Sequence, residues 1–404
     1  MSVITVFSGN YCNAEPAIKE ILGKTNYNHV KDSDIVSKAS ALSHISEDRI
    51  SKAFSAKISV FNQFTREREK SIAYLRLAAA EMLVDDNMLV DGFTALLVPR
   101  EISHVLRICI IADMKYRISV AASSGISESD ALKVVHKSDE DRMAWTTTVL
   151  DTRDPWDSSM HDMVLPADKM SSEEMAALVG QMLEKDVLKA GPESKKAAED
   201  FRLASRVEVA LVEKGHFAPV KAAAGVITIT VDKPVLMLKR LEEELKSVAG
   251  KIQGVKSVET KVGKRFYQSD IVRKFDVEMP SKLLLVDDER QFVQRLSERL
   301  LMREIGSAIA YDGESALKIV KEEEPDVMIL DLKMPGIDGI EVLKRVKQTN
   351  PDMEVIILTG QGTEADRKLC MELGAFAYLE KPVDVEVLSE TIKKANEKIK
   401  KKKT

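Results

Sequence analysis

Five polar side chains in the C-terminal third of the chain have the chemistry needed to accept and stabilise a phosphoryl group. Each one ends a short apolar run or follows it closely, and such runs are typical of strands that are buried on both faces of a parallel sheet. Because the carboxyl ends of parallel strands meet at one edge of a sheet, we expect these side chains to converge. They are Asp287, Asp288, Asp331, Thr359 and Lys381.

Three of the five side chains are carboxylates, and like charges at short range resist ionising together. A hard cation relieves that repulsion, and Mg²⁺ uses one or two carboxylates together with water and phosphate oxygens. The cation and Lys381 would both neutralise a phosphoryl group that arrives on one aspartate, while Thr359 offers a hydroxyl donor. The set therefore predicts phosphoryl transfer to an aspartate nucleophile, with Mg²⁺ as the cofactor.

The stretches between these residues must position them. Apolar runs that predict strands alternate with amphipathic runs that predict helices, and together they make five strand–helix units from about 281 to about 399. This alternation is typical of an α/β domain with a parallel sheet. The strands are expected at 282–286, 308–310, 326–330, 354–358 and 375–379.

Four motifs in this region resemble those of the receiver domain of two-component response regulators. Asp287 and Asp288 resemble the acidic pair of that family, and residues 329–336 resemble its phospho-acceptor strand with the loop that follows. Residues 357–360 resemble its switch segment, and residues 379–382 resemble its lysine motif, in which the proline usually follows a cis bond. The resemblance implies a flavodoxin-like (βα)5 receiver over 281–399.

The resemblance also implies roles for individual residues. Asp331 would be the phospho-acceptor. Mg²⁺ would be held by Asp288, Asp331 and the backbone carbonyl of Lys333, with Asp287 acting through water. Lys381 would be the lysine that contacts the phosphoryl group.

Two more residues would form the switch. Thr359 matches the switch hydroxyl of the receiver family and Tyr378 matches its switch aromatic. The negative charge of a phosphoryl group would draw both side chains inward and reshape the surface formed by the fourth and fifth strand–helix units.

The first part of the chain, 1–185, also predicts alternating strands and helices and hence an α/β domain with a parallel sheet. Residues 48–83 are helical in composition. The domain resembles the cytidylate-kinase-like branch of P-loop nucleotide kinases. The stretches that carry the resemblance are 4–10, 107–112, 117–118, 126–142 and 162–171.

One departure from that family concerns the phosphate-binding loop. The loop requires GxxxxGK[ST], in which backbone N–H groups and the lysine hold phosphates. The turn at 8–16 has one glycine, no lysine and an acidic Glu15. We therefore expect a domain that lacks phosphoryl transfer and serves as a sensor or protein-interaction module. The sequence assigns no cofactor-binding residues to it and leaves open whether it still binds a nucleotide.

The middle of the chain predicts a smaller unit. Residues 186–199 contain Gly191 and Pro192 among many charges and predict a linker. Residues 200–262 predict the order α-β-β-α-β, with the second helix at 235–249, and resemble a BON-type module. Residues 263–280 are polar and predict a second linker.

Composition sets limits on location and partners. The formal net charge of −5 over 404 residues argues against nucleic acid as a partner. Cys12, Cys109 and Cys370 are far apart and lack the spacing of a disulfide framework or a zinc site. The N-terminus does not have the pattern of a signal peptide, and no apolar run has the length of a membrane span. We expect a cytoplasmic location.

These predictions combine into a regulator of two-component phosphorelay signalling. A sensor histidine kinase would phosphorylate Asp331, and output would pass through contacts with a further protein; a homodimer remains open. Two alternatives stay open as well. One is a nucleotide kinase, of the cytidylate type, regulated by its receiver, and the other is a scaffold that works without phosphorylation.

Overall fold

The computed structural model describes residues 2–83, 87–232, 238–263, 282–303, 305–360 and 362–403. The chain divides into two compact units: unit 1 comprises Met1–Ile58 and Arg68–Val272, and unit 2 comprises Ser59–Glu67 and Arg273–Thr404. Unit 1 holds a five-stranded sheet and a three-stranded sheet, and unit 2 holds another five-stranded sheet. The predicted α/β class is confirmed. In the described residues, no helix combines the length and the apolar character that a membrane crossing needs.

The first sheet of unit 1 is parallel and has the order β2-β3-β1-β4-β5. Four of its strands lie where the apolar runs at 3–7, 88–90, 105–112 and 163–165 predict them, and the fifth, β2, was not predicted. Only Val30 is buried in β2, so this edge strand leaves no apolar run in the sequence. The strands are β1 (Val3–Ser8), β2 (Asn28–Lys31), β3 (Met88–Asp91), β4 (Val105–Ile111) and β5 (Met163–Pro166).

The helices of the N-terminal region alternate with these strands, with one correction. The stretch 48–83 is broken after Phe54, because Asp141 accepts hydrogen bonds from Ala56 N at 2.6 Å and from Ser55 Oγ, and these hold the backbone outside a helix. The helices are α1 (Ala14–Thr25), α2 (Asp32–Ser43), α3 (Glu47–Ser51), η1 (Lys52–Phe54), α4 (Asn62–Thr65), α5 (Glu67–Met82), η2 (Phe93–Leu97), α6 (Met114–Ser123), α7 (Glu128–Leu150), η3 (Ser158–Met160) and α8 (Ser172–Leu183).

The predicted linker at 186–199 is largely helical. After η4 (Asp186–Leu188), helix α9 runs over Pro192–Glu213, and Pro192 lies in its first turn, where a missing N–H costs nothing. Ser194 Oγ lies 2.7 Å from His104 Nδ1, which ties the start of α9 to the first sheet. Further along α9, Phe201 is buried in the core of the N-terminal region, so this segment packs as an ordered part of unit 1.

The middle module has the predicted order. Strands β6 (Val220–Ala223) and β7 (Val226–Val231) are antiparallel, while β7 and β8 (Ser257–Val262) are parallel. Helix α10 (Leu238–Ala249) and the second half of α9 cover one face of this sheet. The predicted start of that helix at Val235 and residues 264–280 of the predicted second linker lie outside the described residues.

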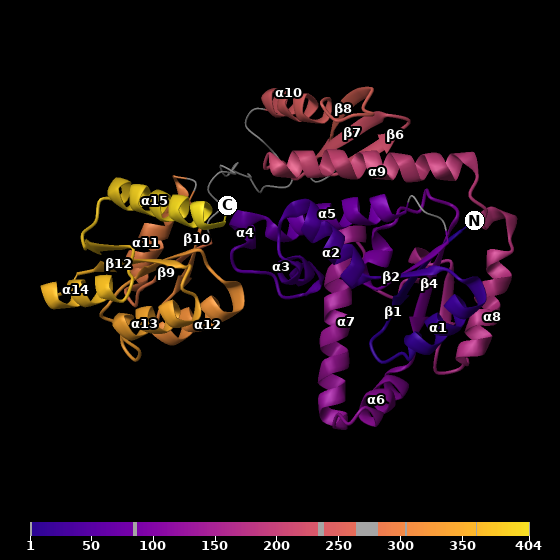
Figure 1. Ribbon diagram of the computed structural model, residues 1–404, viewed down its shortest axis with the longest axis horizontal. Helices are drawn as coiled ribbons and strands as arrows, with labels where there is room; N and C mark the ends of the chain where they lie inside the picture. The colour runs from indigo at the N-terminus through magenta and orange to yellow at the C-terminus, as the bar shows by residue number, and fades with distance from the viewer. Residues whose placement is uncertain are drawn as a thin grey trace. The chain divides into compact units, whose positions relative to one another are not determined.

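The sheet of unit 2 is parallel and has the order β10-β9-β11-β12-β13, which confirms the five predicted strand–helix units. Its strands are β9 (Leu283–Val286), β10 (Ser307–Ala310), β11 (Val327–Leu330), β12 (Glu354–Thr359) and β13 (Ala377–Glu380). Helices α11 (Arg290–Leu301) and α15 (Val385–Lys403) cover one face, and α12 (Gly313–Glu323), α13 (Gly339–Thr349) and α14 (Glu364–Glu372) cover the other (Figure 1).

Candidate functional site

The candidate site lies at the carboxyl ends of the strands of unit 2. Strands β9 and β11 are buried along their whole length, so the first polar side chains are those of the residues that follow them, Asp287 and Asp331. The sheet ladder continues one residue past each strand: Asp287 N donates to Ala310 O, and Asp331 N donates to Val286 O. Lys381 N likewise donates to Thr359 O at 2.9 Å. The backbone of Asp287, Asp331 and Lys381 is therefore fixed by the sheet.

Three carboxylates meet there, as predicted. Ligand oxygens of Asp287, Asp288 and Asp331 all lie within 4.8 Å of one another. Asp287 and Asp331 are buried, while Asp288 is exposed. Leu332 N donates to Asp331 Oδ1 at 2.8 Å, and Glu289 N donates to Asp287 Oδ1 at 2.9 Å. This donor set fits a hard divalent cation such as Mg²⁺, because it offers carboxylate oxygens on a surface that water can reach.

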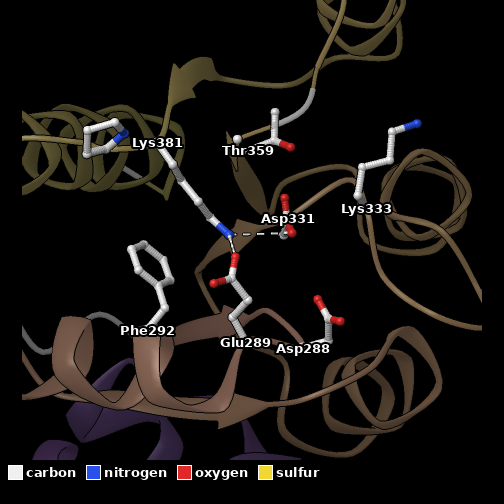
Figure 2. Close-up of a pocket in the computed structure, with 9 residues that line it drawn as sticks. Asp288, Glu289, Phe292, Asp331, Lys333, Thr359 and Lys381 are labelled. Carbon is white, nitrogen blue, oxygen red and sulfur yellow. Dashed lines mark hydrogen bonds and ion pairs between the residues drawn. The ribbon is translucent and has the colours of Figure 1, made fainter.

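The Lys381 ammonium group joins two of these carboxylates. Its Nζ lies 2.6 Å from Asp287 Oδ2 and 3.5 Å from Asp331 Oδ2, and it also contacts the exposed Glu289 at 3.4 Å. The aliphatic stem extends across the pocket, and Nζ lies 4.5 Å from the centre of the Phe292 ring (Figure 2). The Lys381–Pro382 bond is cis, as the resemblance implied. A positive charge is thus held beside the predicted phospho-acceptor.

Burial and charge shift the acid–base properties of this pair. Burial raises the pKa of Asp287 above its ordinary value, although hydrogen bonds from Lys381 and Glu289 N work against that rise. Burial alone would lower the pKa of Lys381, but the hydrogen bond to Asp287 and the charges of nearby carboxylates raise it instead. Lys381 therefore stays charged at neutral pH and supplies a fixed positive charge.

A pocket of about 600 Å³ opens over these groups. Thr359 and Lys333, both predicted, line it, together with Gly360 and Pro382. Figure 2 shows the Lys333 side chain directed away from Asp331, so its ammonium group does not compete with Lys381 for the aspartate. The space can hold a phosphoryl group on Asp331 between Lys381 and Thr359.

Sequence reasoning missed three residues of this site. Glu289 and Phe292 line the pocket at the start of α11, but in the sequence they look like an ordinary charged cap and an apolar helix residue. Gly339 begins α13 directly against the loop that follows Asp331. A Cβ there would overlap Asp331 O and lie 2.7 Å from Leu332 Cα, so only glycine fits without a shift. The sequence signal for Gly339 is a glycine at a helix start, which many helices share.

The turn after β1 in unit 1 differs from a phosphate-binding loop. Its carbonyl oxygens at Ser8 and Asn10 accept hydrogen bonds from the guanidinium groups of Arg142 and Arg117, at 2.6 and 2.8 Å. Arg117 is buried and also forms a two-point ion pair with Asp139, at 2.8 and 2.7 Å. The turn therefore presents acceptors to internal arginines, where a phosphate-binding loop presents N–H donors to a ligand.

Comparison with known proteins gives two family matches. Residues 283–393 match the response regulator receiver domain, and residues 3–169 match the cytidylate kinase-like family. A curated relative, the probable transcriptional regulator ycf27 of Guillardia theta, is 38% identical over 118 residues, which cover 29% of this chain and 46% of that protein. The chain thus spans less than half the length of this relative.

Solved receiver structures also resemble this part of the chain. A receiver domain protein from Clostridium thermocellum is 38% identical, with a TM-score of 0.29, and the match covers 30% of this chain and 97% of that chain. A CheY-like receiver domain protein from Methanospirillum hungatei is 28% identical, with a TM-score of 0.29 and coverage of 30% and 98%. Neither family match covers 200–262, so the BON-type interpretation stays a prediction. Residues 283–393 are a response regulator receiver domain, and residues 3–169 belong to the cytidylate kinase-like family.

Proposed function

We propose that Asp331 accepts a phosphoryl group from a partner histidine kinase and that the modified receiver passes the signal on through protein contacts. A receiver domain implies a histidine kinase as its partner. The observation that carries the proposal is the Lys381 ammonium group, which lies 3.5 Å from Asp331 within a cluster of three carboxylates. This arrangement suits an acceptor whose product carries more negative charge than the free side chain.

The chain's own residues perform the transfer by positioning. The N–H of Leu332 holds Asp331 Oδ1, which leaves Oδ2 on the Lys381 side as the attacking atom. A bond forms from Oδ2 to phosphorus while the bond from phosphorus to the donor breaks, and the donor keeps the electron pair. Thr359, at the end of β12, supplies a hydroxyl group to the phosphoryl oxygens.

Asp288, Asp331 and the Lys333 carbonyl would hold Mg²⁺, with Asp287 acting through water. When it is bound, Mg²⁺ supplies positive charge that neutralises the phosphoryl oxygens. The cluster of three carboxylates supports this assignment, because without a cation it concentrates negative charge at the place where more must arrive.

For the cytidylate kinase-like region we infer a role without phosphoryl transfer. The arginines bonded to Ser8 O and Asn10 O support this inference, because a nucleoside triphosphate would need donors where the turn offers acceptors. ATP-dependent phosphorylation of CMP by the full chain, lost in Arg142→Ala, would instead support a nucleotide kinase regulated by its receiver.

The test of the main proposal is exposure of the full chain to acetyl phosphate with Mg²⁺, followed by intact-mass measurement. We expect the mass of one phosphoryl group to be added to the wild type and not to Asp331→Asn. Asp338→Asn, at the cap of α13 outside the carboxylate cluster, is the matched control and should be modified like the wild type. No modification of the folded wild type would favour the scaffold alternative. The predicted cytoplasmic location, output protein and homodimer stay predictions.

A further inference from the structure

The hydroxyl group of Tyr378 is buried without a hydrogen-bond partner among the residues that the structure describes. Tyr378 lies on β13, and its ring packs against the core on the α12–α13 side of the sheet. A buried hydroxyl without a partner costs about 1–3 kcal/mol. Packing therefore stabilises the inward position of this ring, and the buried hydroxyl group destabilises it.

The space that the hydroxyl group occupies exists because residue 362 is glycine. A Cβ on Gly362 would overlap the Tyr378 hydroxyl oxygen and would lie 3.0 Å from its Cζ. The same Cβ would lie 2.9 Å from Cγ2 of Thr359. Tyr378 and Thr359 thus both border the space beside Gly362, and Thr359 also lines the pocket over Asp331.

The neighbouring glycine shows that the restriction is local. A Cβ on Gly360 would meet only Lys381 Cβ at 3.7 Å and Cδ at 3.9 Å, which are ordinary contact distances. Of the two glycines, only Gly362 is crowded by the aromatic ring.

We propose that Gly362 is a positioning residue that allows the Tyr378 ring to lie inward against Thr359. The proposal rests on the proposed function, because it assigns a regulatory part to the same site. A side chain at 362 drives the ring outward, where its hydroxyl group reaches water. Packing favours the inward position of the ring, and hydration of the hydroxyl group favours the outward position. Such a balance lets a change at Thr359 move the ring.

The test follows the ring in the full chain by ¹⁹F NMR of 3-fluorotyrosine-labelled protein, with the Tyr378 resonance assigned from its absence in Tyr378→Phe. Without any phosphodonor, Gly362→Ala should shift this resonance and increase its sensitivity to replacing H₂O with D₂O, as exposure requires. Gly360→Ala is the matched control, and its Tyr378 resonance should stay at the wild-type position. A Gly362→Ala resonance that also stays at the wild-type position would overturn the proposal.

A second measurement separates crowding by the hydroxyl group from general damage to the loop. The loss of thermal stability in Gly362→Ala should be smaller in the Tyr378→Phe background, because the atom that the new Cβ overlaps has been removed. An equal loss in both backgrounds would contradict the assigned contact.

Acetyl phosphate with Mg²⁺ is added last. In the wild type the Tyr378 resonance should respond to phosphorylation, and in Gly362→Ala the response should be reduced while the added mass remains. If no protein gains mass, the proposed function fails, but the spectra of the resting protein still decide whether Gly362 positions the ring.

Discussion

The Lys381 ammonium group lies nearer to Asp287 than to the proposed phospho-acceptor Asp331, at 2.6 Å against 3.5 Å. The lysine therefore offsets the charge of Asp287 and also stands beside Asp331, where we propose that the phosphoryl group is added. Because its charge would repel a cation held by the same carboxylates, Lys381 and Mg²⁺ would act against each other before the proposed phosphorylation. After it, both would face the same new negative charge.

Replacing Lys381 with glutamine should therefore tighten Mg²⁺ binding, by about tenfold, because one adjacent positive charge is lost from the site. The dissociation constant can be measured by calorimetric titration of the full chain at low ionic strength. Lys381→Arg keeps the charge and should bind Mg²⁺ much like the wild type. Equal or weaker binding by Lys381→Gln would contradict the competition between the two cations.

Most of the site could be predicted from the sequence because three of the receiver strands are buried on both faces. In β9, β11 and β12 every residue is buried, so each strand stands out as an apolar run and the polar residue at its end is conspicuous. The same reasoning located Thr359 at the end of β12, whereas Lys381 follows β13, whose residues are partly buried or exposed, and was identified by its motif. The topology of the sheet then brings these ends together.

The remainder depends on contacts that leave no periodic pattern. Glu289 and Phe292 face the pocket because α11 begins at Arg290, beside the carboxylates. A predicted helix start does not show which face of the helix borders a site. The break before α4 depends on Asp141, which is 85 residues away from Ala56. The edge strand β2 has a single buried residue, so its sequence cannot be told from that of a loop.

Gly339→Ala should destabilise the receiver by about 1–3 kcal/mol, because the new Cβ must push α13 away from the Asp331 loop. The same shift should slow modification by acetyl phosphate. Gly336→Ala is the control: a Cβ there meets nothing within 4 Å, although the positive φ of 84° adds strain of about 1 kcal/mol. Scanning calorimetry of the full chain can measure this loss. The unfolding transition of the receiver is the one whose temperature changes when Mg²⁺ is added. A smaller loss for Gly339→Ala than for Gly336→Ala would contradict the crowding.

The three cysteines should resist alkylation in the folded protein. Cys12, Cys109 and Cys370 are all buried, and burial raises the pKa of Cys109 to about 12 and that of Cys370 to about 11. At pH 8 the reactive thiolate fraction of Cys370 is then about a hundredfold lower than that of a free thiol. Iodoacetamide followed by intact-mass measurement should label none of them quickly, and all three after denaturation. Rapid native labelling of Cys370 would instead identify a reactive thiol.

The last prediction concerns the contact of α5 with α9 in unit 1. Tyr74 is buried, its hydroxyl group donates to Glu213 Oε1 at 2.7 Å, and Lys70 Nζ lies 2.9 Å from the same oxygen. Burial is the main cause that raises the pKa of Tyr74, and the hydrogen bond to Glu213 raises it further. The folded state therefore holds the phenol proton more tightly than the unfolded state does.

This contribution to stability is fully present below the ordinary tyrosine pKa of about 10 and is lost as the pH rises from there through the folded-state value. Tyr74→Phe should lower the unfolding free energy by about 1–2 kcal/mol at neutral pH. The difference from the wild type should shrink above pH ~10. Urea unfolding followed by tryptophan fluorescence reports on unit 1, because Trp145 and Trp156 both lie there. In a Glu213→Gln background the effect of Tyr74→Phe should be smaller, and an undiminished effect would show that the hydroxyl group acts without Glu213.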